Sequence, residues 1–230
     1  MKLIAFTGAP RVGKSEASDY MVRTGDNYVK HTIARGLYEE VANAFHVTVA
    51  QLGSDEWKRG SVPMLALEHC RDPEFQRLIQ ELETPERPGV KRILDGCILD
   101  KARSSRFILQ RWASEYRRAQ NPRYWVNQFG EDLRLDLGKN IAVCDLREDL
   151  EAQFLEEYAT MHGYSTLIIN IESWRNLKTN HSSDNGVSAQ YIDATVQNNG
   201  ELEEMFAQIE VHLKGKVWHP QTSTQYNTSL

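Results

Sequence analysis

The chain is poor in cysteine and contains no long apolar run. Three cysteines, Cys70, Cys97 and Cys144, occur in 230 residues, and no two of them have the spacing of a metal-ligand pair. Such a sparse, odd count is typical of a reduced, cytoplasmic protein without structural zinc. Apolar runs such as 3–6 and 167–171 are far shorter than the roughly twenty residues of a membrane helix, and the first is too short for a secretory leader. We therefore expect no membrane association.

An excess of positive charge is also missing. The chain has 27 Lys and Arg residues against 32 Asp and Glu residues, which gives a formal net charge of -5. A protein that binds a nucleic acid polymer usually presents a broad basic surface, so we expect no such partner. Neither an internal repeat nor a flexible linker divides the sequence, and we expect one domain over residues 1–230.

What the sequence does contain is an alternation of short apolar runs and amphipathic segments. Strands are expected at 2–6, 28–33, 140–144 and 165–171. Helical spacing of apolar residues predicts helices from Lys14 and over 37–45, 106–119, 125–137, 150–161 and 202–213. This alternation is typical of the α/β class, so we predict a three-layer fold with a mainly parallel central sheet. Prolines interrupt 52–105, where we expect short helices and loops.

Residues 8–15 match the pattern GxxxxGK[ST], which binds nucleotide phosphates. The motif follows an expected strand and opens an expected helix, as its mechanism requires. Its glycines let the backbone fold around a phosphate, and the helix N-terminus adds a partial positive charge. Lys14 is predicted to contact the β- and γ-phosphates, and the Ser15 hydroxyl to bind Mg²⁺. The predicted ATP-binding residues of this loop are Gly8, Arg11, Val12, Gly13, Lys14, Ser15 and Glu16.

Asp145 directly follows the expected strand 140–144. Ligands of open α/β sheets bind at the carboxyl ends of the strands, so this carboxylate is a candidate for holding Mg²⁺ together with Ser15. The alternative is a helix N-cap, because Glu148, Asp149 and Glu151 follow as the first turn of a helix.

Arginines on the expected helix 106–119 form a candidate substrate site. Phosphoryl transfer spreads negative charge over oxygen atoms, so a kinase needs arginines that converge on the phosphates. Gln110, Ser114 and Arg118 stand four residues apart and would share one helical face, with Arg106 one turn earlier. Trp125 follows a short turn and is placed to stack on a base or to wall the pocket. The alternative is the ordinary solvated face of an amphipathic helix.

A second basic stretch, 174–181, follows the last expected strand. In a kinase, a lid at this place would deliver Arg175 or Lys178 to the phosphates. The alternative is a mobile surface loop.

In this setting the sequence resembles the bacteriophage-type deoxynucleoside monophosphate kinases, P-loop proteins related to the nucleoside monophosphate kinases. The resemblance covers most of the chain in ordered blocks. After the P-loop these are the helix 37–48, the block 106–118 with Trp125, the strand end 145–147, the lid segment 181–184 and the segment 198–202. It implies helical monophosphate-binding and lid subdomains, which we place at 31–105 and 172–186. The C-terminal residues are rich in Gln, Thr and Ser, so we expect a polar tail at 216–230.

The resemblance also implies an activity, the ATP- and Mg²⁺-dependent phosphorylation of a deoxynucleoside 5′-monophosphate to the diphosphate. ATP and the monophosphate are then the partners, with a homodimer as the assembly common in such enzymes and the host cytoplasm as the location. By resemblance, Arg175 and Lys178 act on the transferring group, and Asn199 and Gly200 lie near the ATP base. The residues that would bind the monophosphate are Arg106, Gln110, Ser114, Arg118, Trp125, Asp145 and Arg147.

Several positions differ from the family pattern. Ala113 and Ser114 stand where the family has Gly-Thr, Asn199 where it has Asp, Asp184 where it has Glu, and Tyr38 where it often has Lys. These differences leave the transfer chemistry intact but leave the acceptor base open, a modified pyrimidine included. A kinase for another small metabolite, such as dephospho-coenzyme A or shikimate, and a regulatory ATP-binding module stay as alternatives.

Overall fold

The computed structural model describes residues 1–24, 27–83, 96–174 and 186–216. Contacts among its residues divide the chain into two compact units. Unit 1 comprises Met1–Ile33 and Val126–Leu230, and unit 2 comprises Ala34–Trp125. Most of the lid and of the C-terminal tail expected from the sequence lies outside the described residues.

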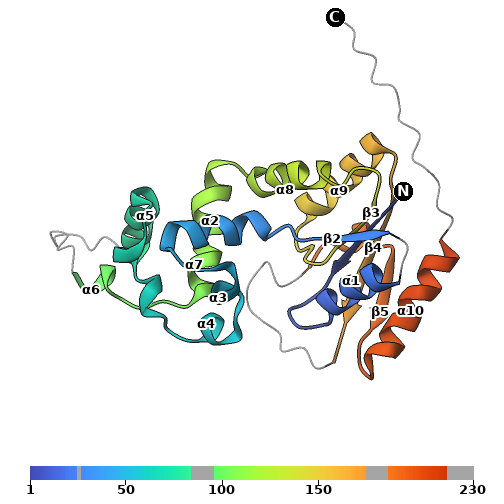
Figure 1. Cartoon of the computed structure of the whole chain (residues 1–230), viewed down its shortest axis with the longest axis horizontal. Coiled ribbons are helices and arrows are strands. Elements are labelled where there is room, and N and C mark those ends of the chain that lie inside the picture. Colours follow the sequence, from blue (N-terminus) through green and yellow to red (C-terminus); the bar gives the residue numbers. More distant parts are fainter. Residues whose placement is uncertain (25–26, 84–95, 175–185, 217–230) are drawn as a thin grey trace, which may run out of the picture. The chain divides into compact units, whose positions relative to one another are not determined.

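Unit 1 is built on a five-stranded sheet in which every pair of neighbours is parallel (Figure 1). The order is β2-β3-β1-β4-β5, with β1 in the centre. Every residue of β1 from Leu3 to Thr7 is buried, as expected for a parallel strand that is covered on both faces. This confirms the predicted α/β class and the parallel sheet. The strands are β1 (Lys2–Thr7), β2 (Tyr28–His31), β3 (Asn140–Val143), β4 (Ser165–Glu172) and β5 (Ala194–Gln197).

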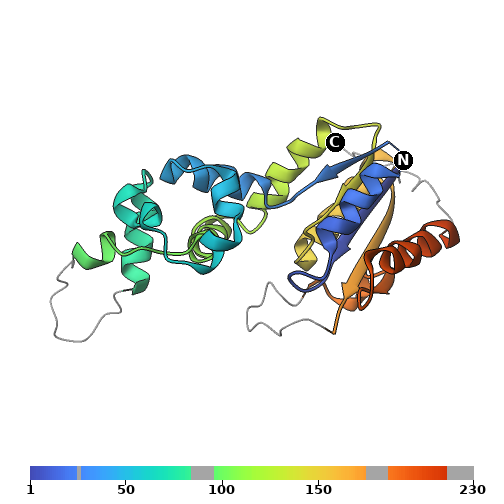
Figure 2. The same cartoon turned by 60° about the horizontal axis from the view of Figure 1, so that its bottom comes forward.

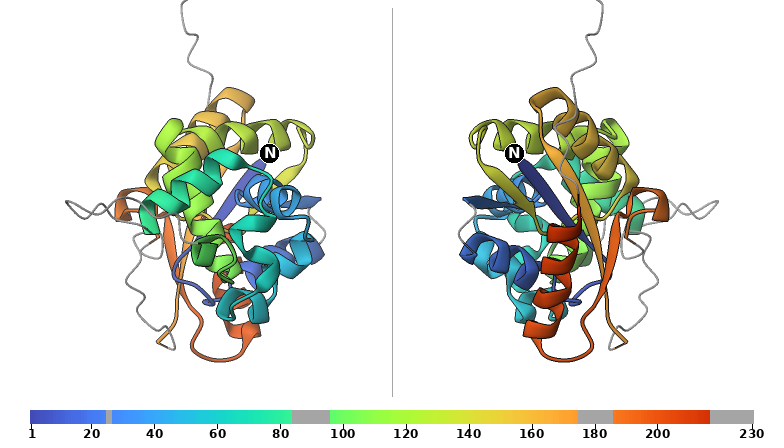
Figure 3. Two further views of the ribbon diagram at one scale, coloured as in Figure 1. Left: turned by 90° about the vertical axis from the view of Figure 1, so that its left-hand side faces the viewer. Right: turned by 90° about the vertical axis from the view of Figure 1, so that its right-hand side faces the viewer.

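Helices cover both faces of this sheet. Alternate side chains of β1 point to opposite faces. Ile4 and Phe6 belong to a core with buried residues of α1 and α10 (Figure 2). Leu3 and Ala5 belong to a second core with residues of α8 and α9 (Figure 3). Unit 1 is therefore a three-layer unit. The helices are α1 (Lys14–Arg23), α8 (Tyr124–Arg134), α9 (Asp149–His162) and α10 (Leu202–Gly215).

Unit 2 is helical and has a core of its own. Phe75 and Trp112 lie at its centre, with ring centroids 4.6 Å apart. Pro73 is the first residue of α5, where its missing N–H costs no hydrogen bond. The described part of 52–105 thus consists of short helices and loops, as predicted. The helical segments are α2 (Arg35–Phe45), α3 (Val49–Gly53), α4 (Asp55–Arg59), η1 (Pro63–Leu65), η2 (Leu67–His69), α5 (Pro73–Glu83), α6 (Gly96–Leu99), α7 (Ser105–Arg111) and η3 (Trp112–Arg118).

Two features differ from the sequence-based expectation. No strand was expected at 194–197, yet β5 lies there at the edge of the sheet. The strand has only four residues and buries only Ala194 and Val196, so its sequence contains no continuous apolar run. The second feature is η3, which is π-helical although an α-helix was expected over 106–119. None of the described helices is both long and apolar enough to cross a membrane.

Candidate functional site

Residues 8–13 form a loop between β1 and α1, where the sequence motif requires it. Gly8 has a φ of 123°, and a Cβ at this position would lie 2.3 Å from the carbonyl oxygen of Ile171. Gly13 has a φ of 105°, and its Cβ would lie 2.7 Å from the side-chain nitrogen of Asn198. Both positions therefore require glycine. Arg11 is also left-handed, with a φ of 66°, which is uncommon for a residue with a side chain.

Left-handed backbone therefore recurs at Gly8, Arg11 and Gly13 of this loop. In anion-binding loops, alternation of right- and left-handed residues turns successive N–H groups toward one concavity, so this backbone is compatible with the predicted phosphate site. Gly13 is the N-cap of α1 and makes no side-chain capping bond. No N-cap side chain therefore occupies the first N–H groups of α1, which follow directly after the loop and carry a partial positive charge.

The ammonium group of Lys14 lies over the loop. Its Nζ donates hydrogen bonds to the carbonyl oxygens of Gly8 and Ala9, at 2.7 and 2.6 Å. The side chain is buried, whereas Arg11, Ser15 and Glu16 are exposed. The structure thus places a cation against two carbonyl oxygens of the loop, next to the exposed Ser15.

Asn198 holds the loop from the other end of the chain. Its side-chain nitrogen donates to the carbonyl oxygen of Val12 at 2.8 Å, and its backbone N–H donates to the carbonyl oxygen of Glu172 at 2.8 Å. The family resemblance predicts Asn199 and Gly200 near the ATP base but gives no role to Asn198. Its contact with the loop depends on the position of β5, which was not expected.

Asn199 contacts the segment that follows β4. Its Oδ1 accepts a hydrogen bond from the backbone N–H of Trp174 at 2.9 Å, and its Nδ2 donates to the side chain of Gln197 at 3.2 Å. Gly200 lies beside Glu204, whose carboxylate would be 2.3 Å from a Cβ at that position. Their proximity to an ATP base stays a prediction.

Asp145 lies beyond the carboxyl end of β3, the strand next to β1. Its Oδ1 accepts a hydrogen bond from the backbone N–H of Ile33 at 2.8 Å. The N-cap of α9 is Glu148, so the alternative role of Asp145 as that cap is not realised. Arg147 is exposed, and its backbone N–H donates to the buried carboxylate of Glu151 at 2.8 Å. Among the described residues, no group of three or more His, Cys, Asp and Glu gathers as a metal site.

The predicted substrate residues of unit 2 lie on or beside η3. Arg106 is exposed, and Gln110, Ser114 and Arg118 are half-buried. The α-helix predicted over this segment is wrong for residues 112–118, which are π-helical. The common face of Gln110, Ser114 and Arg118 stays a prediction. Trp125 is only 4% exposed, and its indole N–H donates to the carbonyl oxygen of Ala113 at 3.3 Å. In this arrangement the ring is closed to a ligand.

The π-helical segment brings Trp112 and Arg117 onto one carboxylate, that of Glu40 in α2. The indole Nε1 of Trp112 and the Nε of Arg117 each donate to its Oε2 at 2.8 Å, and the hydroxyl of Tyr124 donates to its Oε1. Burial disfavours the guanidinium charge, but the hydrogen bond to Glu40 outweighs this effect and raises the pKa of Arg117. These two donors are five residues apart, the spacing of π-helical hydrogen bonds.

A second carboxylate, Asp72, organises the start of α5. Its Oδ1 accepts the backbone N–H groups of Glu74 and Phe75, at 3.1 and 2.9 Å, and its Oδ2 accepts the hydroxyl of Tyr116 at 2.8 Å. Burial and this hydrogen bond raise the pKa of Tyr116, so the phenol stays protonated and donates.

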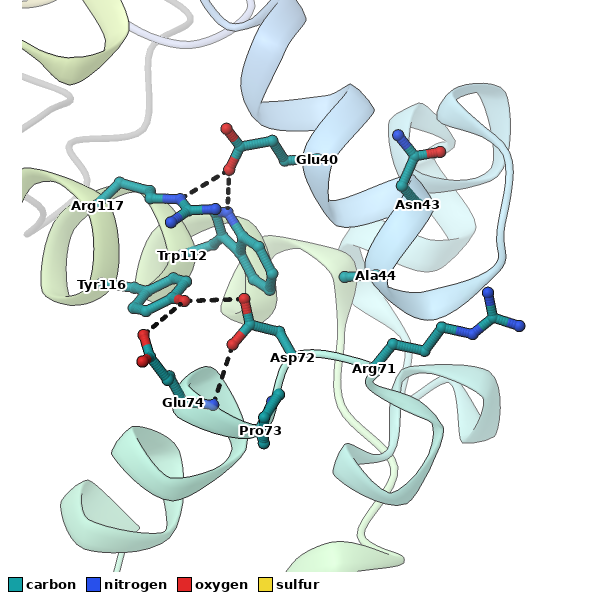
Figure 4. A pocket seen from close by; sticks show the side chains of 10 residues that line it. All are labelled: Glu40, Asn43, Ala44, Arg71, Asp72, Pro73, Glu74, Trp112, Tyr116 and Arg117. Carbon is teal, nitrogen blue, oxygen red and sulfur yellow. Dashed lines mark hydrogen bonds and ion pairs between the residues drawn. The ribbon is translucent and has the colours of Figure 1, made fainter.

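A pocket of about 570 Å³ lies among these side chains (Figure 4). Figure 4 shows Glu40 and Asp72 on either side of the Trp112 indole. The residues that line the pocket are Glu40, Asn43, Ala44, Arg71, Asp72, Pro73, Glu74, Trp112, Tyr116 and Arg117. Of the described residues that were predicted to bind substrate, none lines this pocket. The predicted lid residues Arg175 and Lys178 lie outside the described part of the chain.

Models of known protein families give no match to this chain, and the sequences of curated proteins give none either.

Proposed function

We propose that this protein is a P-loop kinase that transfers the γ-phosphoryl group of ATP to a deoxynucleoside 5′-monophosphate. The observation that carries the proposal is the loop 8–15 between a central parallel strand and a helix, with glycine required at Gly8 and Gly13. The ordered resemblance to the bacteriophage-type monophosphate kinases supports the choice of acceptor. The sheet order β2-β3-β1-β4-β5 is consistent with a P-loop fold.

In the proposed mechanism, the backbone N–H groups of the loop bind the ATP phosphates. Lys14 exchanges its carbonyl partners for the β- and γ-phosphate oxygens, where its charge stabilises the transferring group. The acceptor oxygen attacks the γ-phosphorus in line while the bond to the β-phosphate oxygen breaks, so ADP leaves without a covalent enzyme intermediate.

Magnesium would be held by Ser15 and Asp145. A hydroxyl and a carboxylate are oxygen ligands of the kind that Mg²⁺ prefers, and its remaining ligands are usually phosphates and water. When bound, the ion neutralises phosphate charge. On the chain's side, the Ile33 N–H fixes the Asp145 carboxylate at the end of β3.

The acceptor's phosphate is assigned to the cationic and hydroxyl side chains of 106–118, Arg118 and Ser114 first among them. Both residues are half-buried. Arginine is suited to this role because its planar guanidinium donates two parallel hydrogen bonds to a phosphate.

A coupled ADP-release assay tests the proposal. ATP and Mg²⁺ are supplied with each deoxy- and ribonucleoside monophosphate in turn, with dephospho-coenzyme A, and with no acceptor as the control. We expect rapid ADP formation that depends on a deoxynucleotide acceptor. ADP formation that is indifferent to every acceptor would refute the proposal and favour a regulatory ATP-binding module. Turnover only with an acceptor such as dephospho-coenzyme A would favour the other small-metabolite kinases.

A further inference from the structure

Three loops of unit 1 begin next to one another, at the carboxyl ends of neighbouring strands. The strands β1, β4 and β5 are neighbours, and their parallel register pairs Thr7 with Asn170 and Glu172 with Gln197. The same end of the sheet is therefore where three segments start: the P-loop, 173–174 and 198–200. In open α/β sheets, ligands bind at these carboxyl ends of the strands.

Asparagine side chains tie the three loops together. Asn198 donates to Val12 of the P-loop, and Asn199 accepts the backbone N–H of Trp174. A third bond joins Asn198 to the end of β4 through Glu172. Because Asn198 and Asn199 are consecutive, the backbone of Trp174 is connected to the P-loop through two side-chain hydrogen bonds.

The indole of Trp174 is 73% exposed. It is the one aromatic side chain among the large exposed apolar residues of the described chain, the others being Met, Val and Leu. By contrast, Trp112 and Trp125 are 2% and 4% exposed. When another aromatic system covers a flat aromatic surface of this size, apolar area is removed from water and the free energy of the complex falls.

We propose that Trp174 is the stacking surface for the base of the nucleotide whose phosphates bind the P-loop, and that Asn199 positions it. This inference rests on the proposed nucleotide-binding function of that loop. Stacking uses the π-face that every base has, so it favours bases by area and not by hydrogen-bond pattern. The class of ligand is thus a nucleoside triphosphate with a purine base, ATP or GTP, in preference to CTP or UTP.

The test separates the base from the phosphates. Binding of Mg·ATP and of Mg·tripolyphosphate, which has no base, is measured by titration calorimetry on the full chain. Trp174→Ala is expected to weaken ATP binding roughly tenfold to a hundredfold and to leave tripolyphosphate binding unchanged. Trp174→Phe restores most of the ATP affinity, and Asn199→Ala loses part of it. Met161→Ala, on α9 and equally exposed at 74%, is the matched control and changes neither ligand.

Tryptophan fluorescence supplies a second reading. ATP is expected to quench the wild-type emission and tripolyphosphate to leave it unchanged, and the quench disappears in Trp174→Phe although ATP still binds. Unchanged ATP affinity in Trp174→Ala would overturn the proposal, as would an equal loss for both ligands. If the wild-type chain bound neither ligand, the P-loop function would fail as well. Tripolyphosphate binding that is lost in Lys14→Ala would retain that function whatever Trp174 does.

Discussion

The two units hold their polar groups in different ways. In unit 1 the candidate site is a contiguous loop of eight residues, 8–15, whose shape follows from a strand, two glycines and a helix N-terminus. In unit 2 the polar groups that line the pocket meet across long stretches of sequence. Glu40 is 72 residues from Trp112 and 77 from Arg117, and Asp72 is 44 residues from Tyr116. A local motif can therefore be recognised in the first unit, whereas the second reveals its network only when folded.

The two units also differ in what a substitution of their polar residues is expected to change, catalysis in unit 1 and stability in unit 2. In unit 1, Lys14 bonds to the carbonyls of its own loop, within six residues. In unit 2, Glu40 and Asp72 join different helices, so their loss would loosen the packing of the unit. We expect substitutions in the loop to act on chemistry and substitutions in the network to act on folding.

The largest effect is expected for Lys14→Ala. Turnover should fall about a thousandfold or more, because the proposed mechanism uses this cation to stabilise the transferring group. The melting temperature should stay close to that of the wild type. A suitable control is Lys30→Ala, which breaks only an exposed pair with Asp19. Turnover near the wild-type rate in the Lys14 variant would contradict the assignment of the loop.

Glu40→Ala should have the largest effect on stability. It removes the acceptor shared by Trp112, Arg117 and Tyr124, and leaves a partly buried guanidinium without its carboxylate. We expect the free energy of unfolding to decrease by about 2–4 kcal/mol, measured by urea denaturation. The exposed carboxylate of Glu81 on α5 provides the matched control, Glu81→Ala. Equal, small changes in both variants would show that Glu40 does not hold the helices together.

Arg118→Ala tests the acceptor site proposed in unit 2. Loss of the proposed charge-assisted phosphate contact should weaken monophosphate binding roughly tenfold to a hundredfold and leave ATP affinity intact. The control is Arg111→Ala, on the same helical run, whose guanidinium pairs with Glu115. Equal losses of affinity for both nucleotides would indicate a structural role for Arg118.

The smallest effect concerns the pH dependence of unit 2. Burial disfavours ionisation of Glu83, but the hydrogen bond from Arg103 at 2.6 Å outweighs it and lowers the pKa of this carboxyl. Because the pKa of Glu83 is lower in the folded than in the unfolded chain, its ionisation stabilises the fold at a pH above the unfolded-state pKa near 4.3. This stabilisation is lost as the pH falls through the folded-state pKa. The difference between the wild type and Glu83→Gln, on the order of 1 kcal/mol at pH 7, should thus shrink toward pH 3. A difference in melting temperature that is constant from pH 7 to pH 3 would contradict this assignment.

Much of unit 1 could be predicted from the sequence because its central strands are continuous apolar runs. The strands β1, β3 and β4 and the helices α1 and α9 lie where apolar periodicity places them, and the loop 8–15 lies between β1 and α1 as its motif predicts. The edge strand β5 could not be predicted, since only Ala194 and Val196 are buried. For the same reason the hydrogen bond from Asn198 to Val12, which spans 186 residues, could not be predicted. The only sequence feature near Asn198 was the short family resemblance of 198–202.

Unit 2 was predictable as a set of short helices but not in its detail. The amphipathic pattern of 106–119 gives a helix, and no residue type in it distinguishes an α-helical turn from the π-helical turn of 112–118. That turn determines which side chains meet Glu40. The spacing of residues in the sequence therefore could not predict the pocket or its carboxylates.

Transfer of a radiolabel shows whether this chain moves a phosphoryl group from ATP to a deoxynucleoside monophosphate. ATP labelled at the γ-phosphate is incubated with Mg²⁺, the wild-type chain and each deoxynucleoside monophosphate, and the products are separated by chromatography. We expect label in a deoxynucleoside diphosphate, and none there when Lys14 is replaced by alanine. Label that appears only in inorganic phosphate, with every acceptor, would refute the proposed kinase activity.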